Sequence, residues 1–338
     1  MMNVIVVGSG FAGITFAEKL RTLNSDIRIS LITRESDGFY SRPLLSHGFS
    51  KEGIERSIIL KTFDAIRQNG IDIISASEVE TIDRHNKALK LKGDSNVRTL
   101  EYDRLVLALG SAAFIPPHLS KDREHFHTFN SLADLVTLRR LRQSFLDRNI
   151  TPHWAIIGGG LIGCEVASDL AAVGDKVSLF HAMERLMERQ LDDEDSQKLQ
   201  KVLQHNNIEI LLKQNVTGIT KNRDEIVVNA EKSGKFDAVI VACGFKPRTE
   251  LAASAHLTVN RGIKVNSFLQ TDDPDIFALG DVAELPDGKL YPFILPIRSQ
   301  AQWLAEFIID EDIQPWNAPD FKPKSKVHGF TADNPKFF

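Results

Sequence analysis

The residues of this chain best suited to chemistry are glycines in two short motifs. Each motif reads G-x-G-x-x-G and follows a short apolar run, at Val4–Gly13 and at Trp154–Gly163. In such a motif the first glycine permits a tight turn, the second lets a pyrophosphate approach the backbone, and the third lets a helix pack on a strand. The six glycines are Gly8, Gly10, Gly13, Gly158, Gly160 and Gly163. Because both motifs stand between an apolar run and a helical pattern, the sequence predicts two dinucleotide sites.

The apolar runs around these motifs indicate one α/β domain inserted into another. Strands are predicted at Asn3–Val7 and Ile27–Ile32, with a helix over Phe11–Leu23 between them. The inserted domain has its last strand in the run VIVACG, so the later run that ends at Gly280 and Asp281 must return to the first sheet. We predict two Rossmann-like dinucleotide-binding domains with parallel sheets and antiparallel hairpins, the first made of residues 1–115 and 247–315, the second of residues 116–246, followed by a tail of residues 316–338.

Three further helices are predicted outside the motifs. One opens the inserted domain, with apolar residues at helical spacing at Leu132, Leu135, Leu138 and Leu141. An amphipathic helix is expected near Ile58–Gln68, after a long loop that runs through Ser50. Another helix is expected to open at Pro296, because proline is favoured in the first turn of a helix.

Composition and charge narrow the class of protein. The 338 residues are 42% apolar, which is enough to bury real cores, and the apolar run at the N-terminus is too short to span a membrane. We therefore expect a cytoplasmic protein without a membrane segment. A net charge of −4 argues against a nucleic-acid partner, which favours a basic surface. The two cysteines, Cys164 and Cys243, lie outside any C-x-x-C pair, so we expect small buried side chains rather than a redox dithiol, and no metal site.

Several segments, taken in order, resemble the FAD-dependent pyridine nucleotide reductases. They are VVGSGFAG, FYSRPLLSHGFS, LVLALGS, GGGLIGCEVASDL, CGFKPRTELA, VNRGIKVNSFLQT and IFALGDVAE. More narrowly, the runs RPLLS at Arg42–Ser46 and RTELA at Arg248–Ala252 resemble the rubredoxin and flavorubredoxin reductases, over Asn3 to about Ile309. The resemblance implies FAD, NADH rather than NADPH, and electrons passed singly to a small acidic iron protein, rubredoxin or flavorubredoxin. A ferredoxin reductase of an oxygenase system, or a nucleotide-binding interaction protein with structural FAD, are the alternatives.

The resemblance implies roles for Arg42 and Glu165. Arg42 would lie over the flavin near N5, where a cation stabilises the electron density that a hydride brings, and Glu165 would face the nicotinamide. The rubredoxin reductases usually have lysine where this chain has Arg42, which changes geometry more than charge. A surface arginine and a glutamate favoured by the helix dipole are the alternatives. His47, in the same loop, is either a proton donor or a packed histidine.

The resemblance also implies cofactor contacts elsewhere. Asp281 would bind the ribityl hydroxyls unless it forms an Asx turn, and Thr33, with Glu35 nearby, would hold the ribose through hydroxyl and backbone groups. The helix that opens at Pro296 would turn its positive end toward the flavin. The implied cofactor-contacting residues are Gly8, Ser9, Gly10, Phe11, Ala12, Gly13, Thr33, Arg34, Arg42, Pro43, Val79, Ala108, Gly110, Gly158, Gly160, Leu161, Ile162, Gly163, Glu165, Glu184, Gly244, Gly280, Asp281, Ile294 and Lys326.

The choice of nicotinamide dinucleotide depends on the end of the second strand of the inserted domain. His181 stands where many NAD enzymes have an acid, and Glu184 follows closely. His181 and Arg185 could instead hold a 2′-phosphate. The rubredoxin reductases also lack the acid and carry a glutamate at the Glu184 position, so NADH is favoured.

The sequence of the C-terminal residues 316–338 differs from that of the rubredoxin reductases. The rubredoxin reductases continue beyond a lysine-containing strand into a C-terminal domain, most of which this sequence does not match. Lys326 best fits the spacing of the family's flavin-contacting lysine, with Lys322 and Lys324 as alternatives. Because rubredoxins are acidic, these lysines and Arg42 are the basic groups expected to meet the acceptor.

Overall fold

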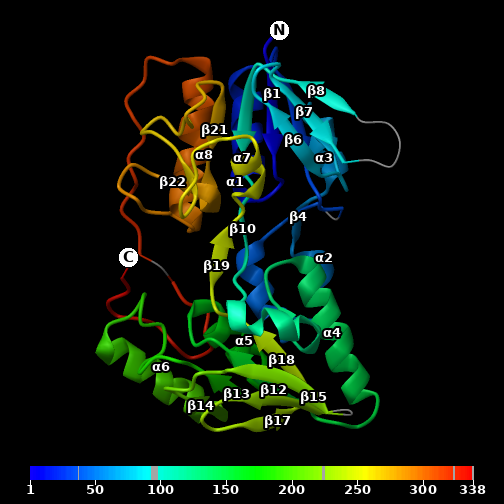
Figure 1. Ribbon diagram of the computed structural model, residues 1–338, viewed down its shortest axis with the longest axis vertical. Coiled ribbons are helices and arrows are strands. Elements are labelled where there is room, and N and C mark those ends of the chain that lie inside the picture. The colour runs from blue at the N-terminus through cyan, green and yellow to red at the C-terminus, as the bar shows by residue number, and fades with distance from the viewer. Residues whose placement is uncertain (37, 93–97, 223–224, 323, 337–338) are drawn as a thin grey trace. The chain divides into compact units, whose positions relative to one another are not determined.

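The computed structural model falls into two compact units, each built on its own parallel sheet (Figure 1). The residues that the structure describes are 1–36, 38–92, 98–222, 225–322 and 324–336. Unit 1 comprises Met1–Ser41, Ile59–Ala112 and Lys246–Phe321, and unit 2 comprises Arg42–Ile58, Ala113–Phe245 and Lys322–Phe338. The segment Arg42–Ile58 thus groups with unit 2, whereas the domain boundaries predicted from the sequence place it in the first domain.

The core of unit 1 is a five-stranded parallel sheet. Its strand order is β21 (Ile276–Ala278), β9 (Arg104–Leu107), β1 (Asn3–Val7), β2 (Arg28–Ile32) and β5 (Asp72–Ile74). These short runs of Val, Ile and Leu are almost entirely buried, as parallel strands covered on both faces require. The parallel pairing of β21 with β9 confirms the prediction that the chain returns to the first sheet after the second motif.

Two long helices of unit 1, α1 (Phe11–Leu23) and α8 (Ile294–Ile309), pack against each other. Each has an apolar stripe at helical spacing, with Ala17 on α1 and Ala301 on α8 among the fully buried residues. The helix α8 begins slightly before Pro296, which still lies in the first turn, where its missing N–H breaks no bond. Among the residues described, no helix combines the length and the apolar character needed to cross a bilayer.

One predicted helix of unit 1 is wrong in its first half. Residues Ile59–Lys61 form the strand β4, which pairs with β3 (Phe39–Tyr40), and Thr62 caps the shorter helix α3 (Phe63–Gln68) by accepting a hydrogen bond from Ala65 N at 3.2 Å. Strand pairing and the threonine cap therefore outweigh the amphipathic spacing. The other elements of unit 1 are the antiparallel strands β6 (Val79–Asp83), β7 (Ala88–Leu91) and β8 (Thr99–Glu101), α7 (Glu250–Ser254), β20 (Ile263–Lys264) paired with β22 (Ala283–Glu284), and the 3-10 turn η3 (Gly280–Val282).

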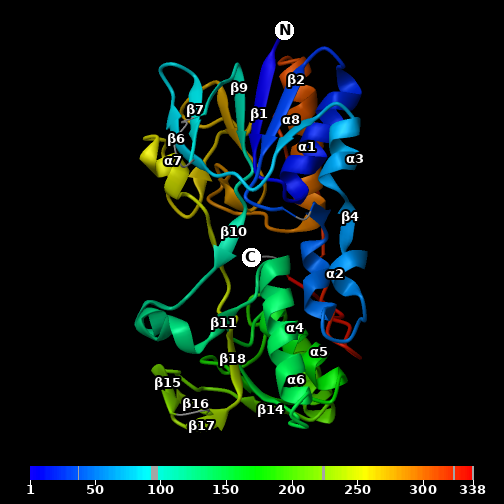
Figure 2. The same ribbon diagram turned by 90° about the vertical axis from the view of Figure 1, so that its right-hand side faces the viewer.

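Unit 2 repeats the arrangement, so the predicted fold class, α/β with two Rossmann-like sheets, is confirmed (Figure 2). The order of its parallel sheet is β11 (His127–Thr128), β18 (Ala238–Val241), β12 (His153–Ile157), β13 (Lys176–Phe180) and β14 (Ile208–Leu211). Its other elements are η1 (Arg42–His47), α2 (Ile54–Ser57), η2 (Pro117–His125), α4 (Leu132–Leu146), α5 (Leu161–Ala172), α6 (Asp193–His205), and the antiparallel strands β15 (Gly218–Asn222), β16 (Glu225–Asn229) and β17 (Gly234–Phe236). The chain passes between the units five times, and two of these crossings lie in β10 (Ser111–Ala113) and β19 (Phe245–Pro247).

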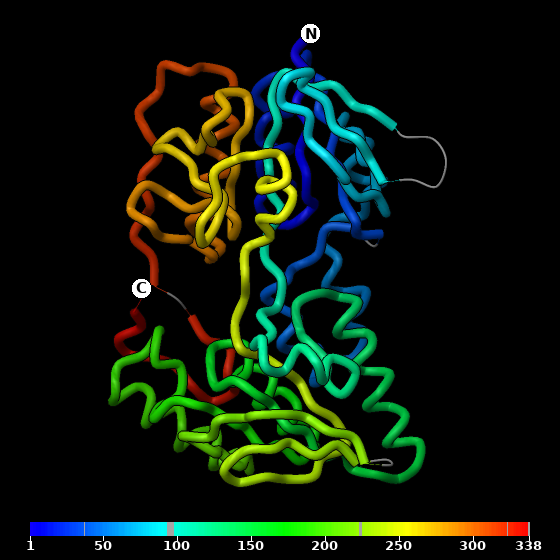
Figure 3. Tube along the Cα trace, viewed as in Figure 1, coloured from blue at the N-terminus to red at the C-terminus, as the bar shows by residue number. Residues whose placement is uncertain are grey.

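The C-terminal segment of unit 2, residues 324–336, has no regular element and lies along the helices that follow the second motif (red in Figure 3). We call this segment the tail. The backbone N–H groups of Asp333 and Asn334 donate to the Asp195 carboxylate on α6, at distances of 2.8 to 3.1 Å. Val327 and Phe330 are buried. The tail is thus part of the packed structure of unit 2.

Candidate functional site

The first glycine motif forms the turn between β1 and α1. Gly8 has a φ of 117°, and a Cβ at this position would overlap the Ala108 carbonyl. A Cβ at Gly13 would overlap the Gly8 carbonyl, so helix and strand pack this closely only with glycine there. At Gly10, by contrast, a Cβ would have no atom of the described residues within 4 Å, apart from atoms of the two neighbouring residues in the chain. The turn is therefore closed on its protein side and open at Gly10, where the N-terminus of α1 can receive a pyrophosphate.

The loop after β21 brings Asp281 close to this turn. Gly280 has a φ of 78°, and a Cβ there would lie 3.0 Å from the Ala12 Cβ at the start of α1. Gly280 N donates to Oε1 of the buried Gln300 at 2.8 Å, and Ser111 Oγ donates to Asp281 Oδ2 at 2.8 Å. The Gln300 Nε2 group is buried and has no hydrogen-bond partner among the residues that the structure describes. A carboxylate and an unused buried donor thus lie near the first motif.

The predicted ribose region is built from hydroxyl groups. The Ser9 and Thr33 hydroxyl oxygens are 2.7 Å apart, and Thr33 Oγ1 accepts a hydrogen bond from Glu35 N at 3.1 Å. Both hydroxyl side chains are buried. Arg34, in contrast, forms an exposed ion pair with Glu78 at 3.3 Å. Thr33 therefore lies beside Ser9 of the motif, whereas Arg34 is at the surface, and the contacts of both residues to a ribose stay predictions.

The remaining predicted residues of unit 1 occupy the ends of strands and helices. Val79 is buried at the start of β6, and Ile294 is the first residue of α8. Arg248, from the RTELA run, donates through its backbone N–H to the Gly110 carbonyl at 3.0 Å and through its guanidinium to the Leu109 carbonyl at 3.2 Å. The contacts of Val79, Gly110 and Ile294 to a bound dinucleotide stay predictions.

The second glycine motif repeats this geometry between β12 and α5. Gly158 has a φ of 115°, and a Cβ there would overlap the Ala242 carbonyl. A Cβ at Gly163 would overlap the Gly158 carbonyl. At Gly160 a Cβ would again meet no atom of the described residues beyond its neighbours within 4 Å. The predicted residues Leu161 and Ile162 form the first turn of α5, so the N-terminus of this helix faces the second open position.

The His181 ring is buried behind the second motif. Its Nδ1 accepts a hydrogen bond from Gly159 N at 3.0 Å, and its Nε2 lies 3.0 Å from the Arg185 carbonyl and 3.1 Å from the Glu188 carboxylate. The Arg185 guanidinium donates to the Leu191 and Glu188 carbonyls at 2.6 and 3.1 Å. Both side chains therefore bind the protein's own backbone, which disfavours the alternative in which they hold a 2′-phosphate.

Glu184 is an exposed acid on the same loop. Its carboxylate lies 2.7 Å from Lys213 Nζ, and this hydrogen bond lowers the pKa of Glu184 below its ordinary value. An ionised carboxylate accepts hydrogen bonds from ribose hydroxyls and repels a 2′-phosphate. Together with the arrangement of His181, it supports the preference for NADH.

Helix α5 carries two buried carboxylates one turn apart, Glu165 and Asp169. Glu165 is 1% exposed and accepts hydrogen bonds from Ser46 Oγ at 2.6 Å, from Lys326 Nζ at 2.9 and 3.0 Å, and from Lys326 N at 2.8 Å. Lys326, the tail lysine with the best spacing, thus reaches this helix. An ammonium group, a hydroxyl and an amide together satisfy a carboxylate that would otherwise be costly to bury.

Arg42 begins the 3-10 turn η1, which packs on α5. Its guanidinium donates to the Asn130 carbonyl at 2.7 Å. Pro43 follows it in this turn, and Ser46 of the same turn reaches Glu165. The structure therefore brings Glu165 together with Lys326 and Ser46. The placement of Arg42 over a flavin stays a prediction.

Asp169 is a candidate that the sequence analysis did not identify. Its Oδ1 lies 3.8 Å from His47 Nδ1 and 3.2 Å from His328 Nε2. Burial lowers the pKa of the His47 imidazole, against the opposing effect of the Asp169 carboxylate, and the His47 side chain is 17% exposed. His47 is thus a packed histidine. The signal that could have identified Asp169 is its spacing of one helical turn from Glu165 on a mostly apolar helix.

Both cysteines are free and unsuited to redox chemistry. Cys164 is fully buried, and burial raises the pKa of its thiol far above the ordinary value. Burial also raises the pKa of Cys243 to about 11. Gly244, which follows Cys243, has a φ of 103° and accepts a hydrogen bond from Phe114 N at 2.8 Å. Thiols this weakly acidic are poor nucleophiles at neutral pH.

The family of the chain follows from a match over most of its length. Residues 2–302 match the family described as pyridine nucleotide-disulphide oxidoreductase, and both glycine motifs lie within that range. The chain therefore belongs to the pyridine nucleotide-disulphide oxidoreductases. The predicted reductase class, and the use of FAD and a nicotinamide dinucleotide, are confirmed.

Individual relatives and solved structures extend this match. The chain is 34% identical over 314 residues to the nitric oxide reductase FlRd-NAD(+) reductase of Aliivibrio fischeri, covering 92% of this chain and 80% of that protein. It is 31% identical over 312 residues to the protein of the same name from Vibrio vulnificus, covering 91% and 79%. A ferredoxin reductase from Rhodopseudomonas palustris superposes with a TM-score of 0.85 at 27% identity, covering 94% of this chain and 78% of that chain. Putidaredoxin reductase in its complex with putidaredoxin gives a TM-score of 0.85 at 27% identity, covering 98% and 80%.

Proposed function

We propose that the protein is an FAD-dependent oxidoreductase that takes hydride from NADH and passes electrons singly to a small iron protein, a flavorubredoxin or rubredoxin. The observation that carries the proposal is the pairing of two open glycine turns, one per unit, with cysteines that cannot act as a redox dithiol. Electrons must then leave from the flavin itself. The names of the curated relatives, which are flavorubredoxin reductases, support this class of acceptor.

The residues of unit 1 fit FAD. Gly10 leaves room for the pyrophosphate at the N-terminus of α1, and Asp281 offers a carboxylate to sugar-like hydroxyls nearby. Gln300 offers a buried donor that has no protein partner among the described residues. When bound, FAD supplies chemistry that the side chains lack, because it accepts two electrons as a hydride and releases them one at a time.

The residues of unit 2 fit NADH. Gly160 leaves the corresponding room at the N-terminus of α5, and the exposed Glu184 carboxylate suits an unphosphorylated ribose. The ion pair between Glu165 and Lys326 involves the fifth residue after the open glycine. We propose that this pair borders the nicotinamide, which agrees with the role that the family resemblance implies for Glu165.

A second candidate acceptor is the ferredoxin of an oxygenase system. The solved ferredoxin reductase at 27% identity favours it, but the curated flavorubredoxin reductases are more similar in sequence. An interaction protein with structural FAD is the third possibility, and it predicts no turnover. We also propose a cytoplasmic location, which fractionation of the producing cells would test.

The acceptor is tested by steady-state kinetics without oxygen. Purified protein that has retained FAD is mixed with NADH and with rubredoxin, flavorubredoxin or an oxygenase ferredoxin such as putidaredoxin in turn. We expect rubredoxin-type acceptors to be reduced at least about tenfold faster than ferredoxin, a discrimination of roughly 1.4 kcal/mol. Faster reduction of ferredoxin would support the second candidate. Absence of NADH oxidation with every acceptor would overturn the enzyme proposal.

A further inference from the structure

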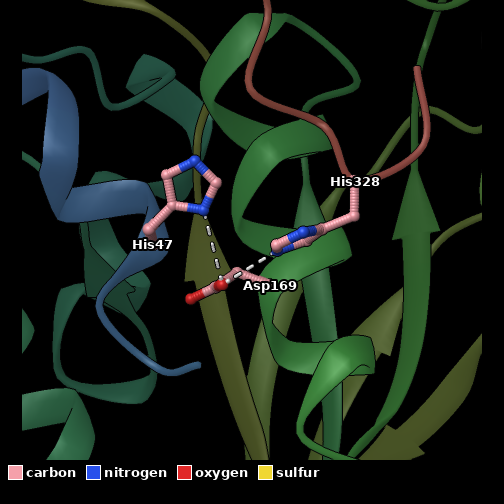
Figure 4. Close-up of side chains that lie close together, drawn as sticks. All are labelled: His47, Asp169 and His328. Carbon is pink, nitrogen blue, oxygen red and sulfur yellow. Dashed lines mark hydrogen bonds and ion pairs between the residues drawn. The ribbon is translucent and has the colours of Figure 1, made fainter. Parts of the chain in front are cut away.

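Three side chains from distant parts of the chain meet on one face of α5 (Figure 4). His47 comes from η1, Asp169 from α5 and His328 from the tail. Both imidazole rings turn a nitrogen toward the same carboxylate oxygen, Asp169 Oδ1, with His47 Nδ1 at 3.8 Å and His328 Nε2 at 3.2 Å. The three ligand-type atoms lie within 4.8 Å of one another. We call these residues the His47–Asp169–His328 cluster.

The carboxylate at the centre of this cluster is held from its other side. Asp169 Oδ2 accepts hydrogen bonds from the backbone N–H groups of Phe49 at 2.7 Å and Ser50 at 3.1 Å. The Ser50 hydroxyl also donates to Asp169 Oδ1. The Asp169 side chain is fully buried. Hydrogen bonds of this kind orient a carboxylate and raise its quality as a metal ligand.

The tail histidine is positioned in the same way. His328 N donates to Ser168 Oγ on α5 at 3.0 Å, which fixes the backbone of the tail beside the cluster. The His328 side chain is 40% exposed, so solvent can reach the cluster from this side. The nearby Lys326 ammonium is paired with Glu165 and therefore does not bring an uncompensated positive charge.

We propose that the His47–Asp169–His328 cluster binds one Zn²⁺ ion. Two imidazole nitrogens and one carboxylate oxygen are the donor set that Zn²⁺ takes when it keeps a fourth position for water. With zinc–ligand bonds of about 2.0 to 2.1 Å, a tetrahedral site needs neighbouring ligand atoms roughly 3.3 Å apart. The distances to Asp169 Oδ1 bracket this value. The two imidazole nitrogens are within 4.8 Å of each other, so side-chain rotations that bring them closer would close the site.

A hydrogen-bonded cluster without a metal is the competing explanation. In that case Asp169 Oδ1 pairs with the Ser50 hydroxyl and with His328 Nε2, which fill its two lone pairs, and His47 Nδ1 at 3.8 Å is too distant for a hydrogen bond. A cation would instead bind both imidazoles, because each then offers a lone pair to the metal. The ion therefore gives His47 Nδ1 a direct role that the hydrogen-bonded cluster does not.

A bound Zn²⁺ ion would cross-link three segments of unit 2. It would join η1, α5 and the tail, which are otherwise held together on this face by hydrogen bonds and the Glu165–Lys326 ion pair. The Zn²⁺ site goes beyond the proposed reductase function and does not depend on it. No metal site was expected from the sequence, in which His47 and His328 lie near opposite ends of the chain.

The test is a calorimetric titration of untagged, chelator-treated full-length protein with Zn²⁺. Wild type should bind one Zn²⁺ per chain. His47→Gln and His328→Gln should each weaken binding by more than the roughly 10- to 100-fold that loss of an outer-shell partner costs. His205→Gln, an exposed histidine at the end of α6, is the matched control and should bind as wild type does.

Thermal unfolding of the same four proteins gives a second readout. The midpoint should rise with Zn²⁺ concentration for wild type and the control, and stay constant for both cluster variants, because an ion that binds only the folded state stabilises it. Wild type that takes up no Zn²⁺, or a His328→Gln protein that binds it as tightly as wild type, would overturn the proposal. The wild-type titration alone can refute the Zn²⁺ site, so the test remains decisive even if a variant folds poorly.

Discussion

Replacing Gly160 by valine should separate NADH binding from folding. Gly160 has a φ of −80° and a ψ of −173°, which valine adopts readily, and its Cβ would meet no described atom beyond its chain neighbours within 4 Å. The protein itself therefore leaves room for a Cβ at this position. A dinucleotide does not, because its pyrophosphate must approach the backbone at this glycine.

The magnitude follows from two costs. Valine is a poorer helix cap than glycine at the N-terminus of α5, which should lower the free energy of unfolding by about 1 kcal/mol. Forcing an isopropyl group into the space of the pyrophosphate costs about 1 to 3 kcal/mol, as overpacking does elsewhere. The affinity for NADH should therefore fall by roughly 5- to 150-fold, since 1.4 kcal/mol is a factor of ten. FAD, which binds at the first motif, should be retained.

The assay is anaerobic stopped-flow reduction of the bound flavin over a range of NADH concentrations. The Thr62→Ala protein, which loses the cap of α3 in unit 1, serves as a control of similar stability. Its half-saturating NADH concentration should match that of wild type. An unchanged NADH dependence in Gly160→Val would refute the assignment of the second motif to NADH, and loss of FAD would show that the two sites are assigned in reverse.

Four further predictions follow from the structure. Lys326→Met should destabilise unit 2 by about 3 kcal/mol in urea unfolding, because it leaves the buried Glu165 carboxylate without its cation. Adding Glu165→Gln should recover most of that loss. A coupling energy below about 0.5 kcal/mol in the double-mutant cycle would show that the ion pair is unimportant for stability. Cys164 and Cys243 should resist alkylation until the protein is unfolded, and mass spectrometry showing rapid native labelling would contradict their raised pKa values. Burial lowers the pKa of His153 from its ordinary 6.5, so the unfolded chain binds the proton more readily. Stability should therefore fall as the pH drops through that value, and His153→Gln should flatten the slope measured by urea unfolding. Finally, the second-order rate of rubredoxin reduction should fall once added salt brings the Debye length below about 10 Å, whereas reduction of the flavin by NADH should change little.

Much of the fold could be predicted because its signals are local. The strand Asn3–Val7 and the helix Phe11–Leu23 have the predicted bounds, since an apolar run and a glycine turn fix where each begins and ends. The helix predicted near Ile58–Gln68 failed because the pairing of β4 with β3 depends on residues distant in the sequence. The spacing of apolar residues within one segment does not indicate which distant strand that segment pairs with.

The candidate site was predicted in part for the same reason. The glycines and Glu165 stand in motifs that can be read from neighbouring residues. The partners of Glu165, by contrast, come from η1 and from the tail, and the hydrogen bonds of Asp169 to the loop after η1 depend on tertiary packing. Only the fold brings Lys326 and His328 to α5.

The central claim is that electrons pass from NADH through FAD to a rubredoxin-type iron centre. It is tested most directly by sequential-mixing stopped flow without oxygen, in which NADH first bleaches the flavin and oxidised flavorubredoxin is then added. We expect that two electrons per chain suffice for bleaching, and that flavin colour returns at the same second-order rate at which the iron centre loses its absorbance. A bleached flavin that reoxidises only on admission of oxygen, while the iron centre stays oxidised, would contradict it.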